Sequence, residues 1–283
     1  MTAATAPTVD AHQHFLDPTR YAYPWIDADM TPLHQPHLPE DLAVALSKAG
    51  VRQTVTVQAR QTLEETQWLL ALADAHPWIA GVVGWVDLTD PALDAVLDGF
   101  ADRPRLVGIR HVTHDEPDPD WLMRDDVCRG LGVLERRGYT FDLLLRPMHL
   151  RHVPALAERF PGLPMVIDHL AKPAIASGRL DGWREDFAAA ARYPNVFCKL
   201  SGMITEADPK RWTAADLAPY VAEAVAAFGF ERLMFGSDWP VCRLAGAYEQ
   251  VVTALREALG PISSHEQAQL FGDTARRFYQ LPD

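Results

Sequence analysis

Short runs of β-branched residues alternate with longer amphipathic, alanine-rich segments along almost the whole chain of 283 residues. Such alternation predicts parallel strands joined by right-handed helical crossovers. The predicted strands cover residues 8–14, 53–58, 79–87, 106–112, 139–145, 164–169, 195–200 and 231–237. The predicted helices cover residues 38–49, 62–75, 90–101, 123–137, 149–160, 182–193, 213–228 and 245–259.

Eight strand–helix units are the number that closes an α/β barrel, and the chain length is ordinary for one such domain. We therefore expect residues 1–283 to form a single (β/α)8 TIM-type barrel. An open, doubly wound sheet shows the same alternation and is the alternative. The longest connection, residues 15–37, follows the first strand, so we expect it on the catalytic face. A helical tail is expected over residues 264–279.

Composition narrows the classes of partner. The net charge is −12 and hydrophobic residues make up 48% of the chain, which favours a large core and disfavours nucleic-acid binding. No segment approaches the ~18 apolar residues of a membrane span, and the first ten residues lack a signal-peptide pattern. We expect a cytoplasmic protein with a small-molecule substrate. The three cysteines form no CxxC pair, so no disulfide framework or zinc knuckle is indicated.

Alternation within each predicted strand indicates which side chains face the barrel interior, because successive residues point to opposite faces. Helices cover the outer face, so the apolar set should lie there. The polar sets should then face inward, toward the place where chemistry occurs. They are Thr54, Thr56, Gln58 and Arg60 on the second strand, Gly108 and Arg110 on the fourth, and Phe197, Lys199 and Ser201 on the seventh.

Two histidines and an aspartate are predicted to meet where the barrel closes. His12 and His14 are two residues apart at the end of the first strand, so they should point the same way. Asp238 ends the eighth strand, which neighbours the first in a closed barrel. Two imidazoles suit a divalent metal ion, and a carboxylate can take a proton from water. Taken singly, the histidines could be surface groups and Asp238 could be a capping residue.

The sixth strand ends in a further candidate pair. His169 is predicted to lie on the inward face together with Met165 and Ile167. Its imidazole could bind a metal ion or polarise a carbonyl oxygen, although a strand-end histidine can also be purely structural. Lys172 follows at the rim, where it could contact an anionic or hydroxylated substrate or simply be solvated.

Four motifs, DAHQHF, VIDHLAKP, CKLSG and MFGSDWP, occur in this order and together resemble the amidohydrolase superfamily. More narrowly, they are similar to its lactonase-type branch, which contains L-fuconolactone and L-rhamnonolactone hydrolases and pyrone-dicarboxylate lactonases. The resemblance covers essentially the whole chain. It implies a barrel with His12, His14, His169 and Asp238 in the active site.

The fourth strand departs from the binuclear members of the superfamily. Those members use a bridging carboxylated lysine or a glutamate there, whereas this strand ends with Arg110 and His111. The resemblance therefore implies at most one divalent metal ion, with zinc preferred because imidazole and carboxylate ligands suit it. Branch members hydrolyse without an obligatory metal, so we expect no required cofactor. The ligands of a bound ion would be His12, His14, His169 and Asp238.

Further residues at or near strand ends are expected to contact the substrate. Aromatic faces and polar donors suit a sugar lactone, which presents apolar ring faces and hydroxyl edges. For each tryptophan the alternative is ordinary packing, and Lys199 is either a substrate contact or part of a buried ion pair. The expected contacts are Trp25, Gln58, Arg60, Trp85, Arg110, His111 and Lys172.

The resemblance implies a hydrolase of carbohydrate catabolism that opens a small lactone, such as L-fucono-1,5-lactone, with water activated by Asp238. One alternative is a metal-dependent decarboxylase of a small aromatic acid on the same barrel. A second alternative, from a different class, is a non-catalytic barrel that binds a small molecule. Loss of a central residue would favour the binding protein, but all four are present.

Overall fold

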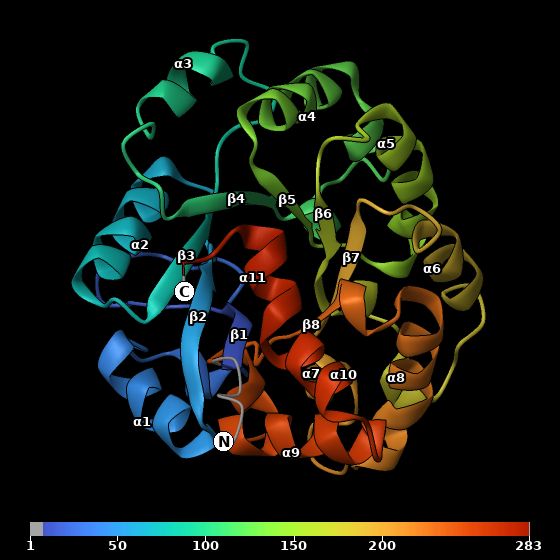
Figure 1. Ribbon diagram of the computed structural model, residues 1–283. Coiled ribbons are helices and arrows are strands. Elements are labelled where there is room, and N and C mark those ends of the chain that lie inside the picture. Colours follow the sequence, from blue (N-terminus) through green and yellow to red (C-terminus); the bar gives the residue numbers. More distant parts are fainter. Residues whose placement is uncertain (1–7, 283) are drawn as a thin grey trace, which may run out of the picture.

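The structure is a computed structural model that describes residues 8–282, so residues 1–7 and 283 of the predicted domain lie outside it. Within residues 8–282, eight parallel strands follow one another in the order β1 to β8 (Figure 1). Gln13 forms a parallel bridge with Trp239, just beyond β8, and so closes the barrel. The α/β barrel is confirmed, and the open sheet is wrong. The strands are β1 Thr8–Gln13, β2 Val51–Val57, β3 Ile79–Gly84, β4 Leu106–His111, β5 Thr140–Leu143, β6 Met165–Ile167, β7 Val196–Leu200 and β8 Leu233–Phe235.

Helices follow the strands and surround the barrel (Figure 1). Their ends carry ordinary signals: Thr62 caps α2 by accepting from the Glu65 amide, and Gly50 ends α1 in the left-handed region. The short helix α7 was not predicted. The helices are α1 Pro39–Ala49, α2 Leu63–Ala75, α3 Leu93–Asp98, α4 Asp125–Arg137, α5 Val153–Arg159, α6 Arg184–Ala190, α7 Met203–Glu206, α8 Ala214–Phe228, α9 Tyr248–Leu259, α10 Ser264–Ala268 and α11 Thr274–Tyr279. A π-helical turn, Gln269–Asp273, joins α10 to α11.

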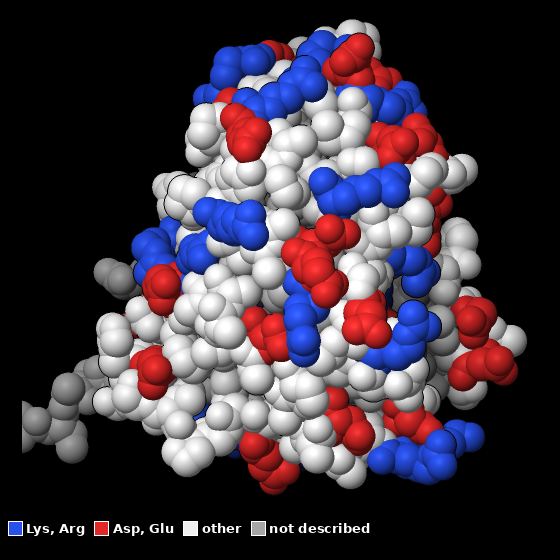
Figure 2. All heavy atoms as spheres, turned by 90° about the vertical axis from the view of Figure 1, so that its right-hand side faces the viewer, with Lys and Arg blue, Asp and Glu red and all other residues white. Residues whose placement is uncertain are grey.

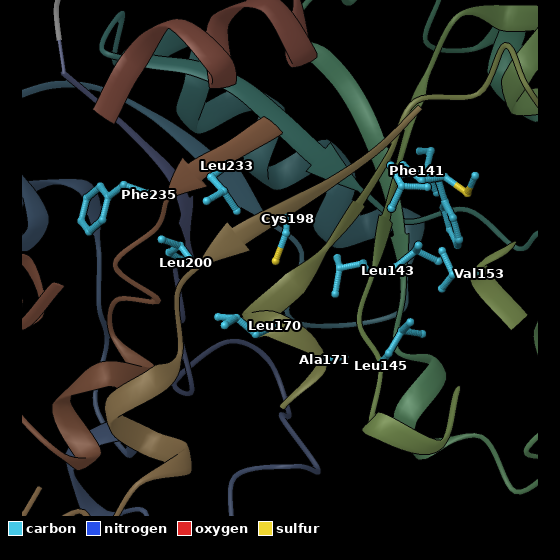
Figure 3. Packing of buried hydrophobic residues seen from close by; sticks show 14 of the residues in the cluster. Phe141, Leu143, Leu145, Val153, Leu170, Ala171, Cys198, Leu200, Leu233 and Phe235 are labelled. Atoms are coloured by element: carbon cyan, nitrogen blue, oxygen red, sulfur yellow. The ribbon is translucent and has the colours of Figure 1, made fainter. Parts of the chain in front are cut away.

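The outer faces of the strands pack against the helices in a large apolar layer. Figure 3 shows part of this layer, where Cys198 and Leu200 of β7 lie beside Leu233 and Phe235 of β8. These side chains are essentially inaccessible to solvent. Burial of this kind contributes roughly 25 cal/mol for each Å² of apolar surface removed from water. The outward parity predicted for β7 is therefore confirmed.

A second apolar cluster fills one end of the barrel interior. Val55 and Val57 of β2 pack there with Ala275 and Phe278 of α11, which lies across the barrel in Figure 1. The predicted faces of β2 are thus wrong: its valines point inward, and Thr54 and Thr56 pair with strand residues whose side chains face the helices. The physical reason is that the tail helix closes this end of the barrel and requires apolar partners inside it.

An irregularity in β1 sets the direction of the first histidine. Asp10 pairs with Thr54 and Gln13 pairs with Thr56, so β1 has one more residue than β2 between these pairs. A β-bulge of this kind re-aims side chains next to it. As a result, Ala11 joins the interior cluster while His12 also reaches inward, toward Asp168.

The long connection over residues 15–37 has a small core of its own. Leu16, Tyr23 and Leu33 are buried there against Ala59, which follows β2. Leu16 forms an antiparallel bridge with His37, and the Trp25 indole donates to the carbonyl oxygen of Ala59 at 2.9 Å. The connection is therefore anchored to the carboxyl end of β2, beside the mouth of the barrel.

Helix length and surface charge bear on whether residues 8–282 could contact a membrane or a polyanion. No helix within residues 8–282 is long and apolar enough to cross a membrane. On the face in Figure 2, cationic and anionic side chains are interspersed. This face therefore carries no large area of a single charge.

Candidate active site

His12 and His14 converge at the carboxyl end of β1. Their Nε2 atoms lie 3.2 Å apart, and both side chains are buried. His14 Nδ1 lies 2.7 Å from the carbonyl oxygen of Val57, to which an Nδ1–H group donates. This bond leaves a lone pair on His14 Nε2, which faces His12. The β1 histidines are thus held with their Nε2 atoms toward a common point.

Asp238 lies beside this pair because the barrel closes between β8 and β1. The Asp238 amide donates to the carbonyl oxygen of His12 at 2.8 Å. Its Oδ1 atom lies 3.7 Å from His12 Nε2 and 3.4 Å from His14 Nε2. The two strand ends therefore bring one buried carboxylate within reach of both imidazoles.

His169 reaches the same carboxylate from β6, with its Nε2 atom 3.8 Å from Asp238 Oδ1. The predicted reason for its position is wrong, because Met165 and Ile167 face the outer layer and Val166 faces the interior. The strand ends at Ile167, and His169 has a φ of 53° in a left-handed turn. Local backbone conformation, not strand parity, directs this imidazole.

The turn that carries His169 is a strained segment. All residues from His169 to Lys172 have positive φ, a conformation that costs roughly 1–2 kcal/mol for each non-glycine residue. The Trp183 indole donates to the carbonyl oxygen of Leu170 at 2.7 Å, and Leu170 is fully buried. A Cβ atom on Gly202 would lie 2.6 Å from His169 Nδ1, so only glycine leaves room for the ring. Tertiary contacts therefore maintain the strain at this site.

Burial sets the protonation of the site. It lowers the pKa of His12 well below the ordinary value, with a further contribution from the charge of Lys199. Burial likewise lowers the pKa of His169. For Asp238 burial opposes ionisation, but the positive charge of Lys172 is among the interactions that bring the net pKa below its usual value. At neutral pH the site therefore combines neutral His12 and His169 with an ionised Asp238.

The donor atoms fit a single divalent metal ion. Ligands about 2.0–2.1 Å from a tetrahedral zinc ion lie ~3.3 Å from one another. His12 Nε2, His14 Nε2 and Asp238 Oδ1 are separated by 3.2, 3.4 and 3.7 Å. These three residues form one group whose ligand atoms lie close enough to hold an ion. The chemistry of the group, two imidazoles and a carboxylate, suits zinc and related ions.

A buried charge network lies next to His12. Lys199 Nζ is 3.1 Å from His12 Nδ1, 2.5 Å from Asp142 Oδ2 and 3.0 Å from Asp168 Oδ1. Arg110 Nη1 donates to Asp168 Oδ2 at 3.1 Å and lies 3.4 Å from His12 Nε2. Lys199 thus belongs to a buried ion pair, the second of its two predicted roles.

Sequence reasoning missed the two carboxylates of this network. Asp142 pairs in register with Arg110 and with Val166, so it faces inward from β5. Asp168 directly precedes His169, and it is Asp168 that takes the inward position that strand alternation had predicted for His169. A signal was present, because charged residues inside strongly apolar strand segments must find buried partners.

A cavity of about 880 Å³ extends from these residues to the surface. His14, His169 and Asp238 line it, whereas His12 does not. Of the residues expected to contact substrate, Trp25, Arg60, Arg110 and Lys172 also line the cavity. The cavity is large enough for a small ring compound, since small-molecule sites are typically ~300–1,000 Å³.

Gln58, Trp85 and His111 are not brought to the cavity wall. Gln58 is fully buried and donates to the carbonyl oxygen of Arg110 at 3.2 Å. The Trp85 indole donates to His111 Nδ1 at 3.3 Å, while His111 stacks on Trp121 with ring centroids 3.9 Å apart. Their positions at strand ends suggested substrate contact, but the structure places them behind the wall, where they support it.

Six polar residues on the cavity wall lie outside the list of expected contacts: Gln61, Thr62, His114, Asp115, Arg146 and Glu206. Glu206 ends α7, six residues beyond β7, and pairs with Lys172 at 2.7 Å. Loops after barrel strands form the catalytic face, and this rule could have selected Glu206. Glu206 reaches the cavity because the short helix α7 places it there, and the sequence carries no strong signal for this helix.

The fold and the site together define an α/β barrel of the type that gathers histidines and an aspartate at the carboxyl ends of its strands. The chain belongs to the amidohydrolase family, whose model, described as Amidohydrolase, matches residues 9–281. This finding confirms the resemblance predicted from the four motifs.

Individual relatives are similar over nearly their whole length. The chain is 38% identical to an L-fucono-1,5-lactonase of Burkholderia ambifaria over 280 residues, covering 96% of this chain and 95% of the relative. It is also 38% identical to an L-fucono-1,5-lactonase of Burkholderia multivorans, covering 97% and 96% of the two chains. A crystal structure of an amidohydrolase from Burkholderia multivorans with bound zinc is 37% identical, has a TM-score of 0.93, and aligns with 98% of this chain and 100% of that chain.

Proposed function

We propose that this protein is a hydrolase that opens the ring of a small sugar-acid lactone, such as L-fucono-1,5-lactone. The observation that carries the proposal is the position of Asp238 on the cavity wall, where its Oδ1 atom lies within 3.4–3.8 Å of the Nε2 atoms of three imidazoles. The similarity to two L-fucono-1,5-lactonases over nearly the full chain supports the same substrate class.

Asp238 is the proposed general base. A water molecule beside His12 and His14 donates a proton to the Asp238 carboxylate, and its oxygen attacks the carbonyl carbon of the lactone. General-base catalysis requires an ionised acceptor within hydrogen-bond reach of the water, and the lowered pKa of Asp238 meets the first condition. A lactone is an activated ester, so this attack needs less assistance than attack on an amide.

His169 is the proposed oxyanion donor. Its Nδ1 atom lies 2.8 Å from Ser201 Oγ, whose hydroxyl can donate to it and leave a proton on Nε2. An Nε2–H group can then donate to the carbonyl oxygen as negative charge develops there. When the ring bond breaks, Asp238 returns its proton to the departing ring oxygen. The product is an open-chain hydroxy acid, which releases a proton at neutral pH.

A divalent ion, preferably zinc, would be held by His12, His14 and Asp238, with His169 nearby. A bound ion would act as a Lewis acid toward the carbonyl oxygen. Two ions are disfavoured because the cationic Arg110 and Lys199 already lie 3.4 and 3.1 Å from His12. By resemblance to the lactonase branch, we propose that turnover does not require the ion.

Several expectations still rest on the sequence. They are the cytoplasmic location, the lack of nucleic-acid and membrane partners, and the organisation of residues 1–283 as one domain with the 15–37 loop at the catalytic face. The structure adds that Trp25, from this loop, lines the cavity. We therefore propose that the loop contributes directly to substrate binding.

The test is a pH-indicator screen against aldono-1,4-lactones, aldono-1,5-lactones and pyrone lactones. We expect proton release with one or more sugar lactones, matched by loss of the lactone in chromatography. Incubation with aromatic acids distinguishes the decarboxylase alternative, which would release carbon dioxide. Binding of lactones without turnover of any of them would instead favour the non-catalytic barrel.

A further inference from the structure

An ion pair stands on the wall of the cavity. Lys172 Nζ lies 2.7 Å from Glu206 Oε1, and the side chains are 20% and 24% exposed. Lys172 ends the left-handed turn after β6, and Glu206 ends α7 after β7, so the pair spans two neighbouring strand ends. Both residues line the cavity together with His169 and Asp238. The pair is therefore accessible to a ligand bound beside Asp238.

The charges around the cavity are nearly balanced. Its cationic residues are Arg60, Arg110, Arg146 and Lys172. Its carboxylates are Asp115, Glu206 and Asp238. Two more carboxylates pair with its cations: the buried Asp168 with Arg110, and the exposed Glu64 with Arg60. Arg146, which is exposed, is the one cation of this set for which residues 8–282 supply no ion-pair partner. Such a wall offers one unpaired cation, which is fewer than a ligand with two carboxylates would need.

The Lys172–Glu206 pair offers a strong donor next to a strong acceptor. An ammonium group only donates hydrogen bonds, and a carboxylate only accepts them. A hydroxyl group does both, so two adjacent hydroxyls of a sugar ring can accept from Lys172 and donate to Glu206 at once. The apolar face of the ring has partners nearby, because Trp25, Leu144 and Leu244 line the same cavity.

We propose that the Lys172–Glu206 pair determines specificity by binding two adjacent hydroxyl groups of an uncharged sugar lactone. This inference rests on the proposed function and names the residues that would distinguish a neutral polyhydroxylated lactone from a dicarboxylate lactone. The pair acts on binding and orientation, whereas Asp238 and His169 act on the carbonyl group. Its loss is therefore expected to raise KM for hydroxylated substrates and to leave kcat nearly unchanged.

The experiment compares two lactones of the same ring size in Glu206→Gln. The first is the best aldono-1,5-lactone, and the second is δ-valerolactone, which has no hydroxyl groups. If δ-valerolactone binds without being hydrolysed, its inhibition constant as a competitive inhibitor of the aldonolactone is compared in place of KM. Hydrogen bonds to a charged group are strong, so we expect KM for the aldonolactone to rise roughly tenfold or more. The value for δ-valerolactone should change less than twofold.

The matched control is Glu223→Gln, which removes the carboxylate of an ion pair with Arg184 on the outer helices. It should leave both KM values unchanged. If the Lys172–Glu206 pair only stabilises the structure of the site, Glu206→Gln should raise KM for both lactones alike or lower kcat. Either result would overturn the inference. So would an unchanged KM for the aldonolactone. If the wild-type protein opens no lactone at all, the proposed function fails, which is a separate and distinguishable outcome.

Discussion

Lys199 Nζ lies 2.5 Å from Asp142 Oδ2 inside the barrel, and neither side chain has exposed surface. Tyr279, from the C-terminal helix α11, donates to the same carboxylate at 2.8 Å. The tail helix is thereby connected, through Asp142 and Lys199, to His12 on the opposite side of the network. The hydrogen-bonded network that holds His12 in place therefore includes a residue of α11, the last helix within residues 8–282.

Replacing Lys199 with methionine should strongly destabilise the protein. The substitution removes one buried cation and leaves the Asp142 and Asp168 carboxylates close together without it. Breaking a buried pair in this way costs about 3–5 kcal/mol. Urea unfolding followed by circular dichroism measures the loss. Lys210→Met, at an exposed position, is the control and should change stability by less than about 0.5 kcal/mol. Equal stability of the two variants would contradict the role of the network.

Replacing Asp238 with asparagine should reduce kcat by roughly a hundredfold or more, because asparagine keeps the size of the side chain but cannot take a proton. Stopped assays on the best lactone measure kcat and KM. The variant should retain the circular dichroism spectrum of the wild-type protein. A folded Asp238→Asn protein that turns over at the wild-type rate would eliminate the proposed mechanism.

Replacing Gly236 with alanine should reduce activity through His12. A Cβ atom at this position would lie 2.6 Å from the Cβ atom of His12 and 3.0 Å from that of Ser201, so His12 must move. A displacement of ~1 Å can cost on the order of a hundredfold in rate. Gly132→Ala is the matched control, because its new Cβ atom would meet Phe160 at an ordinary 3.6 Å. Wild-type kcat in Gly236→Ala would show that the site tolerates this shift.

Glu65 should make stability depend on pH. Burial raises the pKa of this carboxyl group from 4.5 to about 7, although it accepts hydrogen bonds from the Ala59 and Arg60 amides. Between pH 4.5 and 7 the folded state therefore binds more protons than the unfolded state, and the free energy of unfolding falls as pH rises. The full effect is roughly 3 kcal/mol.

Glu65→Gln mimics the protonated group and should remove this dependence. Urea unfolding at pH 5 and pH 8 should show a smaller loss of stability in Glu65→Gln than in the wild-type protein. Glu64→Gln, in which the neighbouring exposed carboxylate is removed, should retain the wild-type loss. Parallel pH profiles for wild type and Glu65→Gln would contradict the raised pKa.

Removal of metal should leave turnover intact. The donor set of His12, His14 and Asp238 can hold one ion, but Asp238 and His169 are proposed to act on water and carbonyl without it. Prolonged chelation, with residual zinc measured by mass spectrometry, should preserve most of the activity on the best lactone. Loss of activity on chelation that zinc restores would make the ion an obligatory part of the mechanism.

The sequence by itself determined the class of fold and which three residues meet where the barrel closes. Eight strand–helix alternations predicted a parallel sheet, and their number favoured a closed barrel over the open sheet that the same alternation allows. His12, His14 and Asp238 could be paired in advance because closure makes the first and eighth strands neighbours. These inferences succeeded because they depend on patterns that extend over many residues, or on the order of the strands.

Tertiary structure alone decided how several side chains are aimed. Simple alternation assigned the faces of β2 and β6 wrongly, because it holds only within a regular strand. The bulge in β1 and the left-handed turn at His169 are unfavourable as local conformations, and distant contacts such as the Trp183 bond to Leu170 maintain them. Asp142 and Glu206 gain their roles from Lys199 and Lys172, partners supplied by other segments of the chain. Contacts of this kind cannot be read from local sequence, because the packing of the complete barrel creates them.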